Sequence, residues 1–476
     1  MSNHPAFDAK YAAGRALRDT TARGSHHHPG NLERDPVQLL KQSSQGRVQR
    51  LVPLRYGRML TSPFAFYRGS AIIQAHDLAG TPHSGIYQQI CGDCHLMNFG
   101  GFATPERNLI FDLNDFDETH PGPWEWDVKR LAASFALAAD HIGCHQDKID
   151  DIVYAGIRSY QSHLADYAEL PALSLWYEKI SFADLREDAT DPDAATLLDG
   201  LIAKAGKRTN ELLLPKMSQK QQGRWIMNDN PPNLFHIHGD NRLFDEDDNW
   251  LSLGNWHTLA DGLIESYRTT LSYSHQQLLG YFYPQDMAFK VVGVGSVGTR
   301  CLVLLLADDC DNPLFLQIKE AVPSVLAQFS PSPACSFTHQ GQRVVTGQRV
   351  MQAASDYFLG WGTGPFGRHF YFRQLRDMKV AVELETLDSD LLQHYARLCG
   401  RALARSHARS HARAGGQGAQ ISGYLGRNDR FASALVDYAQ SYRAQVERDY
   451  QQFRSACQRG ELPAQTEADF GADFRL

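Results

Sequence analysis

The feature that most restricts the fold is a glycine-rich turn between two apolar segments in the second half of this 476-residue chain. Residues 287–294 read MAFKVVGV, residues 293–298 read GVGSVG, and residues 299–307 read TRCLVLLLA. Because β-branched and aromatic runs favour strands, the turn predicts a hairpin. Further apolar runs at 313–321 and 369–375 add strands. The sequence therefore predicts a small antiparallel sheet in this region.

The segments on either side of this sheet have helical periodicity. Apolar residues recur at helical spacing between Pro123 and Gly143, and the glycine is a suitable stop. Asp388 is a suitable N-cap for a second helix, in which Leu391 and Tyr395 share one face. The expected class is α+β, with a small sheet lobe and a larger, mainly helical lobe.

Four regions follow from these patterns. The polar, Gly- and His-rich start predicts a flexible arm that includes the triplet His26-His27-His28, which we interpret as mobile rather than metal-binding. We expect this arm at 1–45, the helical lobe with its insertions at 46–285, the strand-rich lobe at 286–378, and helices completing the larger lobe at 379–476.

Composition excludes several classes of protein. The formal net charge is −7, with 47 Lys and Arg against 54 Asp and Glu. The sequence has no basic stripe, so nucleic-acid binding is not expected. The longest apolar run, Cys301–Ala307, is far shorter than the roughly 20 residues of a membrane span. Eight cysteines are too sparse for a disulfide scaffold, and the first residues lack an apolar signal segment. We expect a cytoplasmic protein without membrane or nucleic-acid partners.

One short segment has the residue types that phosphoryl transfer needs. Asp93, His95 and Asn98 fall within six residues, and Asp112 follows an apolar strand fourteen residues after Asn98. Asp93 is the predicted base for an attacking hydroxyl. Asn98 and Asp112 are the predicted Mg²⁺ ligands, with Asp115 as the second choice for Asp112.

The glycine turn supplies a second candidate site. G-x-G-x-x-G is weak evidence alone, but a strand follows it here, whereas a dinucleotide-binding turn is followed by a helix. A hairpin of this kind covers the ATP phosphates in protein kinases. The expected phosphate-binding residues are Gly293, Gly295, Ser296, Gly298 and Lys319.

The catalytic segment resembles the aminoglycoside phosphotransferase branch of the kinase-like superfamily, whose loop reads H-G-D-x-H-x-x-N. Asp93, His95, Asn98 and Asp112 match this pattern, and Asp127 resembles the family's D-L-A aspartate. The resemblance implies that Asp127 is structural and braces the catalytic loop. It also implies a kinase-like two-lobe fold with ATP and Mg²⁺ as cofactors.

A closer resemblance, over nearly the whole chain, is to a bacterial family known only as a domain of unknown function. The shared motifs are SPFAFYRG, CGDxHxxNFG, LNDFDE, PWEWDVKRLA, QxKEA and RQLRDMK. Because the catalytic loop precedes the glycine loop, a kinase-like fold would have to be circularly permuted. Leu403-Ala404-Arg405-Ser406-His407 is similar to the phosphotransferase L-A-x-L-H helix.

Two positions depart from the pattern of the phosphotransferases and kinases. Cys91 stands where phosphotransferases have histidine. The glutamate that normally pairs with the lysine is also missing, because no acidic residue lies between Glu320 and Asp356. Gln348, Gln352 or a carboxylate from elsewhere remain as partners for Lys319.

Several residues keep two interpretations. Arg68 either anchors a phosphate or substrate carboxylate or forms a structural ion pair. Arg373 and Gln374 follow a strand where a hinge to adenine would lie. His95 is either catalytic or a structural group of the loop. The run from Cys91 to His95 also reads C-x-x-C-H, a haem-attachment pattern, or less favourably a zinc site.

The sequence thus predicts an ATP- and Mg²⁺-dependent phosphotransferase that acts on a hydroxyl of an unknown small molecule or protein. Three alternatives stay open: a nucleotide-binding regulator without turnover, AMP transfer on the same scaffold, and a metal or haem redox protein. The oligomeric state is not legible from the sequence.

Overall fold

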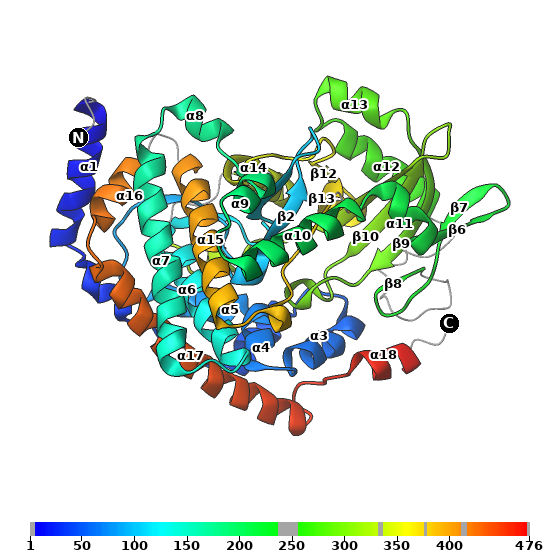
Figure 1. Ribbon diagram of the computed structural model, residues 1–476. Coiled ribbons are helices and arrows are strands. Elements are labelled where there is room, and N and C mark those ends of the chain that lie inside the picture. Colours follow the sequence, from blue (N-terminus) through cyan, green and yellow to red (C-terminus); the bar gives the residue numbers. More distant parts are fainter. Residues whose placement is uncertain (1–4, 237–255, 332–336, 376–377, 411–416, 474–476) are drawn as a thin grey trace.

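The computed structural model describes residues 5–236, 256–331, 337–375, 378–410 and 417–473. Helices and antiparallel sheets together form this part of the chain, so the predicted α+β class is confirmed. In Figure 1 most of the long helices gather on one side of the molecule and the largest sheet lies on the other.

The largest sheet has six antiparallel strands. In spatial order they are β12 (Gly360–Thr363), β13 (His369–Gln374), β11 (Pro313–Glu320), β10 (Cys301–Ala307), β9 (Tyr283–Lys290) and β8 (Leu234–Phe235). β9 and β10 form the predicted hairpin around the glycine turn, with Leu302 opposite Phe289. β10 pairs in turn with β11, where Cys301 lies opposite Lys319.

The apolar run of β10 is explained by burial on both faces. Leu302 and Leu304 pack into one core cluster with residues of α12 (Trp256–Arg268) and α13 (Tyr273–Leu279). Val303 and Leu305 point to the other face and pack with residues of α11 (Asn210–Met217) and β7 (Arg224–Met227), which pairs with β6 (Ser218–Gln221). Alternate residues of a strand face opposite sides, so a strand covered twice is apolar throughout.

The strand-rich unit begins before the predicted boundary at residue 286. β8 pairs with β9 through Leu234 and Phe235, and α12 packs on β12. Tyr267 of α12 stacks on Phe372 with ring centroids 3.9 Å apart, and its hydroxyl donates to the carbonyl of Phe358. The sequence did not reveal this extension, since a two-residue strand is too short to show alternation.

One helix, α14 (Gln340–Met351), lies between β11 and β12 in the chain and packs on β12 and β13. Arg343 joins it to the other side of the molecule by donating to the carbonyls of Asp117 and Thr119. Gly347 is required at the contact, because a Cβ there would lie 2.5 Å from the side chain of Thr119.

The helical block is built on five helices. These are α6 (Trp124–His141), α7 (Gln146–Glu169), α15 (Ser389–Arg409), α16 (Gln417–Leu425) and α17 (Arg430–Gln458). The helices expected before Gly143 and after Asp388 are confirmed, and the Asp388 carboxylate accepts from the backbone of Asp390 and Leu391. α7 and α15 approach closely at two glycines, where a Cβ on Gly400 would lie 2.2 Å from the carbonyl oxygen of Gly156.

Shorter elements complete the described part. Further helices are α2 (Pro36–Ser43), α4 (Pro63–Gly69), α5 (Ala71–Ala79), α8 (Ala172–Tyr177), α9 (Phe182–Glu187) and α10 (Pro192–Gly206). Two small sheets pair β1 (Tyr87–Ile90) with β4 (His120–Pro123), and β2 (Phe99–Ala103) with β3 (Leu109–Leu113) and β5 (Ile180–Ser181).

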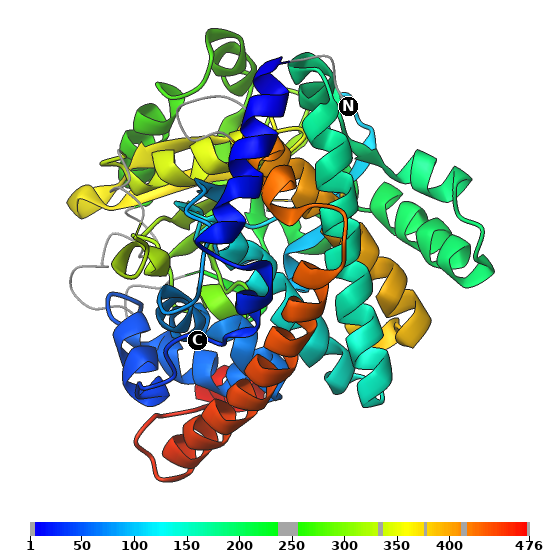
Figure 2. The ribbon, with the colours of Figure 1, turned by 90° about the vertical axis from the view of Figure 1, so that its left-hand side faces the viewer.

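The amino-terminal segment differs from the flexible arm predicted for 1–45. Its described residues form α1 (Pro5–Ala16), short turns and α2, and α1 packs along α16 (Figure 2). His26 is fully buried, and its Nε2 lies 2.7 Å from the hydroxyl of Tyr424. Sequence composition missed this packing because the contacts are made with residues some 400 positions away.

The last described helix packs against an early helix of the chain beside the sheet. α3 (Val52–Met59) contacts α18 (Glu467–Asp473), and Arg58 pairs with Glu467 at 2.8 Å. Phe470 packs with Leu51 and Leu54 in the core cluster of the sheet. In the ranges that the structure describes, no helix has both the length and the apolar character to cross a membrane.

Candidate functional site

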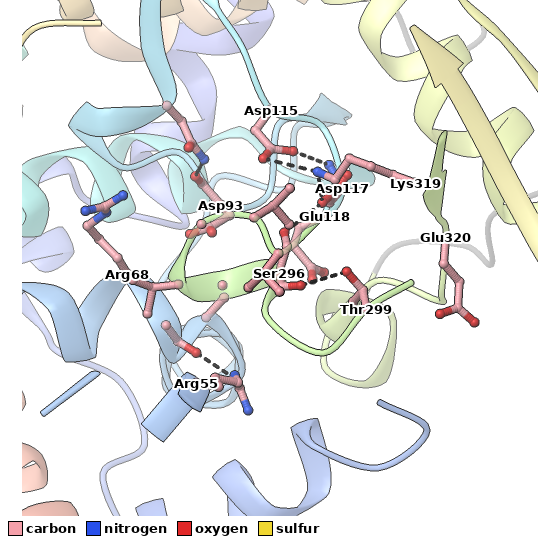
Figure 3. A pocket seen from close by; sticks show the side chains of 18 of the residues that line it. Arg55, Arg68, Asp93, Asp115, Asp117, Glu118, Ser296, Thr299, Lys319 and Glu320 are labelled. Atoms are coloured by element: carbon pink, nitrogen blue, oxygen red, sulfur yellow. Dashed lines mark hydrogen bonds and ion pairs between the residues drawn. The ribbon is translucent and has the colours of Figure 1, made fainter. Parts of the chain in front are cut away.

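A cavity of about 570 Å³ brings together residues of both sides of the molecule. Figure 3 shows part of its lining. Among the described residues that line it, nine are cationic, namely Arg47, Arg55, Arg58, Arg68, Arg208, Lys290, Lys319, Arg373 and Lys379. Five are acidic, namely Asp93, Asp115, Asp117, Glu118 and Glu320. The cavity lining is thus net positive in a protein whose net charge is −7.

The glycine loop forms one wall of this cavity. Gly293, Gly295 and Ser296 line it, and Gly298 closes the turn at φ +87°, a backbone conformation that glycine adopts without strain. Residues outside the sheet hold the loop in place. The backbone N–H of Val48 donates to the carbonyl of Gly298 at 2.8 Å.

Two arginines add further bonds to the same loop. Arg47 Nη1 donates to the carbonyl of Val297 at 2.6 Å, and Arg58 Nη1 donates to the carbonyl of Val292 at 2.6 Å. The loop is therefore anchored from outside the sheet, by the segment before and within α3. Sequence reasoning did not single out these arginines, because nothing local links them to the glycines.

Lys319, the penultimate residue of β11, lines the cavity and pairs with a carboxylate. Its Nζ lies 2.6 Å from Asp117 Oδ2 and 3.6 Å from Asp115 Oδ2. Tyr371, opposite Lys319 on β13, donates its hydroxyl to Asp117 Oδ1 at 2.6 Å. Although burial opposes ionisation, the charge and hydrogen bond of Lys319 hold the pKa of Asp117 well below its usual value.

The partners considered from sequence for Lys319 lie elsewhere. Gln348 donates to Gln352, which in turn donates to the carbonyl of Leu113. Glu320 points away from Asp117 (Figure 3) and pairs with Arg300 at 3.1 Å. Neither glutamine orients the lysine, and the carboxylate comes from the LNDFDE segment instead.

The catalytic loop places Asp93 in the same cavity. Arg130 of α6 donates to Asp93 Oδ1 from Nε at 2.8 Å, and its Nη2 lies 2.7 Å from the same oxygen. The side-chain amide of Asn98 donates to the carbonyl of Asp93 at 2.6 Å. Asp93 is therefore a fixed, ion-paired carboxylate. The sequence signal for Arg130 was its place in PWEWDVKRLA, three residues after Asp127.

Asp127 lies behind the loop and not in the cavity lining. Its carboxylate accepts from the backbone N–H groups of Cys91 and Gly92 at 2.7 and 2.9 Å. His407, from the LARSH segment of α15, lies 3.1 Å from the same carboxylate, and its other ring nitrogen lies 2.9 Å from the hydroxyl of Tyr160. These bonds fix the backbone that carries Asp93.

Asp112 and Asp115, the two candidate metal ligands, lie in different surroundings. Asp112 is fully buried on β3, where Arg405 Nη2 donates to Oδ1 at 2.7 Å and to Oδ2 at 2.8 Å, and the backbone N–H of Ala353 donates to Oδ2. It does not line the cavity, so the preferred choice is not brought to the site. Asp115 does line it, together with Asn98.

His95 is almost fully enclosed beside Asp93. It is 4 % exposed, and its Nε2 lies 3.8 Å from Asp93 Oδ2, too far for a hydrogen bond. Burial, with the positive charges of Arg68 and Arg130, lowers the pKa of His95 well below 6.5. The imidazole is therefore neutral at physiological pH.

The two residues predicted at a hinge have separate surroundings. Arg373 lines the main cavity and donates to Gln317 Oε1 and to the carbonyl of Asn114. Gln374 lines a much smaller neighbouring cavity of about 60 Å³, which Arg373 also borders. Only Arg373 of this pair is brought to the main site.

The C-x-x-C-H run has no metal-like geometry. Cys91 and Cys94 are buried thiols, and burial raises the pKa of Cys94 well above its usual value. Within the described ranges, no three His, Cys, Asp or Glu side chains form a group that could hold a metal ion. The structure thus gives no support to a zinc site at this run.

A family sequence model covers residues 47–456 of the chain, and its description is an uncharacterized protein conserved in bacteria, DUF2252. Searches of curated proteins and of solved structures find no match to the chain. The family model spans the glycine loop, Lys319 and the segment from Asp93 to Asp127.

Proposed function

For this chain, which belongs to the bacterial family DUF2252, we propose an ATP- and Mg²⁺-dependent phosphotransferase activity toward a hydroxyl acceptor. The acceptor is a small molecule or a protein. The fold we propose is a circularly permuted kinase-like one, in which the six-stranded sheet serves as the nucleotide-binding lobe.

The observation that carries the proposal is the position of Lys319. This cation, held by Asp117, shares one cavity with the glycine loop and with Asp93. The excess of cationic residues around the cavity favours a polyanion such as a nucleoside triphosphate. A volume of about 570 Å³ is in the usual range for a small-molecule site.

The arrangement of the sheet is a second support. A hairpin around the glycine loop, the strand β11 that carries Lys319, helix α14 and then β12 and β13 follow one another in the chain. In protein kinases a glycine-rich loop covers the phosphates and a strand lysine contacts them. The order of segments is consistent with a permutation that puts the catalytic loop first.

Each residue then has a role in the proposed reaction. Lys319 contacts the phosphates, and Asp117 keeps its ammonium charged and oriented. Asp93 orients the acceptor hydroxyl and receives its proton. Asn98 and Asp115 fit a Mg²⁺ site, since this ion is commonly held by one or two protein side chains plus phosphate oxygens. The ion would offset charge on the phosphoryl oxygens during transfer.

One observation favours a second candidate, a nucleotide-binding regulator without turnover. The Arg130 guanidinium lies 2.7 Å from Asp93 Oδ1, so this oxygen already binds a protein donor and is less available to an acceptor hydroxyl. The glutamate that the sequence lacks does not add to this case, because Asp117 supplies a carboxylate partner for Lys319.

Labelled ATP distinguishes the candidates. The purified chain is incubated with Mg²⁺ and either γ-labelled or α-labelled ATP, and label is followed on the protein, on inorganic phosphate and on pyrophosphate. Transfer of the γ label to the protein or to water supports phosphotransfer, whereas α label on the protein with pyrophosphate release supports AMP transfer. ATP binding with neither reaction supports the regulator.

Matched variants connect the result to the site. Asp115→Asn should abolish the Mg²⁺-dependent reaction, whereas Asp309→Asn, which removes an exposed carboxylate of the β10–β11 turn, should not change it. A wild-type protein that binds no ATP at millimolar concentration contradicts the proposal.

A further inference from the structure

Arg68 is a charged group of the cavity that has no hydrogen-bond or ion-pair partner in the described part of the chain. Among the described residues, its guanidinium makes no hydrogen bond or ion pair, and its Nε is buried. Its guanidinium carbon lies 5.8 Å from the centroid of the Phe64 ring, within cation–π range. The structural ion pair that was one interpretation of Arg68 is therefore absent from the described part of the chain.

Two neighbouring arginines, unlike Arg68, have hydrogen-bond or ion-pair partners. Arg55 donates to the hydroxyls of Ser43 and Ser44 and to the carbonyl of Gly69, and Arg130 pairs with Asp93. A guanidinium keeps its charge when partly buried, and desolvation without a counter-ion is unfavourable. An anionic ligand would supply the missing partner.

The position of Arg68 fits such a ligand. It lies in the last turn of α4, against the glycine loop, where a Cβ on Gly295 would lie 3.4 Å from the Arg68 carbonyl oxygen. A Cβ on Gly69 would lie 2.9 Å from the side chain of Val294. In Figure 3 Asp93 lies between Arg68 and Lys319, so Arg68 is on the side of Asp93 away from the lysine in this view.

His95 gives a second, independent observation in the same corner. It lines the cavity and is 4 % exposed, and its Nδ1 is buried without a partner in the described part of the chain. Beside Asp93 there are thus two polar groups whose hydrogen-bonding capacity the described residues do not fully use.

We propose that Arg68, with His95 beside it, binds a phosphate oxyanion next to Asp93. The planar fork of a guanidinium donates two parallel hydrogen bonds to such a group. The identity of the anion rests on the proposed function. It is either the phosphoryl group that is transferred or a phosphate carried by the acceptor.

Calorimetric titration of the full chain tests this assignment. Wild type, Arg68→Gln and Arg68→Lys are titrated in Mg²⁺ buffer with ADP, with β,γ-imido-ATP, and then with inorganic phosphate after saturation with β,γ-imido-ATP. Arg50→Gln is the matched control, since Arg50 is exposed and does not line the cavity. It removes one positive charge without touching the site.

Two results support the proposal and identify the source of the anion. If the anion is the transferred group, Arg68→Gln weakens β,γ-imido-ATP binding by about tenfold or more and leaves ADP affinity within about twofold. If it belongs to the acceptor, both nucleotide affinities stay unchanged, and phosphate binding to the loaded protein is lost in Arg68→Gln. Arg68→Lys should be intermediate, because it keeps the charge and loses the fork.

Other results would contradict either the anion site or the proposed function. If nucleotides bind and Arg68→Gln changes neither nucleotide nor phosphate binding, Arg68 is not an anion site, and the proposed function is unaffected. If wild type binds no nucleotide, the proposed function fails. Arg68-dependent binding of inorganic phosphate to the protein alone then still upholds the anion site, and its absence rejects the site as well.

A stability measurement excludes misfolding as the cause. Because Arg68 makes no hydrogen bond or ion pair with the described residues, Arg68→Gln should leave the Tm unchanged or raise it. A structural arginine would instead lower the Tm on removal. Phosphate should raise the Tm of wild type and of Arg50→Gln, and not that of Arg68→Gln.

Discussion

The ammonium group of Lys319 lies 2.6 Å from the carboxylate of Asp117, although 202 residues separate the two in the chain. Lys319 is 3 % exposed at its side chain and Asp117 is 27 % exposed, so the pair is largely desolvated. The bond joins the strand-rich unit to the catalytic segment. It also supplies the carboxylate that could not be found between Glu320 and Asp356.

The losses of stability from replacing Lys319 and Asp117 should not add, because each residue is the charge partner of the other. Lys319→Met leaves Asp117 partly buried without its cation, and we expect a loss of about 2–3 kcal/mol of unfolding free energy. Asp117→Asn should cost about 1–2 kcal/mol, because Asp115 remains 3.6 Å from the lysine. Urea unfolding of the double variant should give less than the sum of the single losses.

The lowered pKa of Asp117 determines the pH range in which its ion pair with Lys319 stabilises the protein. A carboxylate whose pKa is depressed by folding stabilises fully above its ordinary value of about 3.8 and loses that contribution as the pH falls below it. The difference between wild type and Asp117→Asn should therefore shrink below pH 4. A difference that stays constant into acid would contradict the ion pair.

Asp112 and Asp115 should separate stability from ligand binding. Asp112→Asn leaves the buried Arg405 without its full counter-charge and should cost about 3–5 kcal/mol. Asp115→Asn should change stability by no more than about 1 kcal/mol but weaken Mg²⁺-dependent ATP binding by about tenfold or more. Urea unfolding and calorimetry at several Mg²⁺ concentrations measure the two effects. The opposite pattern would restore Asp112 as the metal ligand.

Asp127→Asn should loosen the catalytic loop. An amide in place of the carboxylate cannot accept equally well from both Cys91 and Gly92, so we expect a loss of about 2–4 kcal/mol. Hydrogen exchange of these two backbone amides should become faster than in Asp151→Asn, which changes an exposed carboxylate of α7. Unchanged protection of both amides would show that other contacts fix the loop.

Acid should destabilise the protein through His120. Burial, assisted by the charge of Arg343, lowers the pKa of this imidazole to about 4. The unfolded chain then binds more protons than the folded one between about pH 6.5 and 4, so stability falls as the pH falls through this range. Replacement by glutamine should remove up to about 3 kcal/mol of this loss.

The control for this prediction is His27→Gln, which changes an exposed imidazole. Urea unfolding at pH 7.0, 5.5 and 4.5 measures the slope of stability with pH for wild type and both variants. The slope should decrease for His120→Gln alone. Equal slopes in all three proteins would mean that the imidazole of His120 charges without resistance from its surroundings.

Local signals predicted the individual elements well. Asp388 caps α15 because a carboxylate at that position satisfies backbone N–H groups that any helix start leaves free. The hairpin around GVGSVG follows from strand-forming residues on both sides of a glycine turn. Both depend on neighbours within a few positions, and such relationships can be read along the chain.

Local sequence patterns could not distinguish between similar residues that lie close together in the chain. Asp112 and Asp115 lie three positions apart in one polar segment, and only the packing of Arg405 against the first and the cavity beside the second distinguish them. Composition predicts that His26 lies in a flexible arm, yet it is buried against Tyr424. In each case the deciding contact comes from a residue hundreds of positions away.

The sequence by itself thus determined the α+β class, the glycine hairpin with its lysine, and the segment from Asp93 to Asp127, because each depends on local periodicity and spacing. Only the tertiary structure decided which carboxylate holds Lys319, which aspartate reaches the cavity, and that Arg68 has no partner among the described residues. The physical reason is that charge pairing and burial depend on distances in space between residues that are far apart in the chain. Those distances are fixed only when the chain folds.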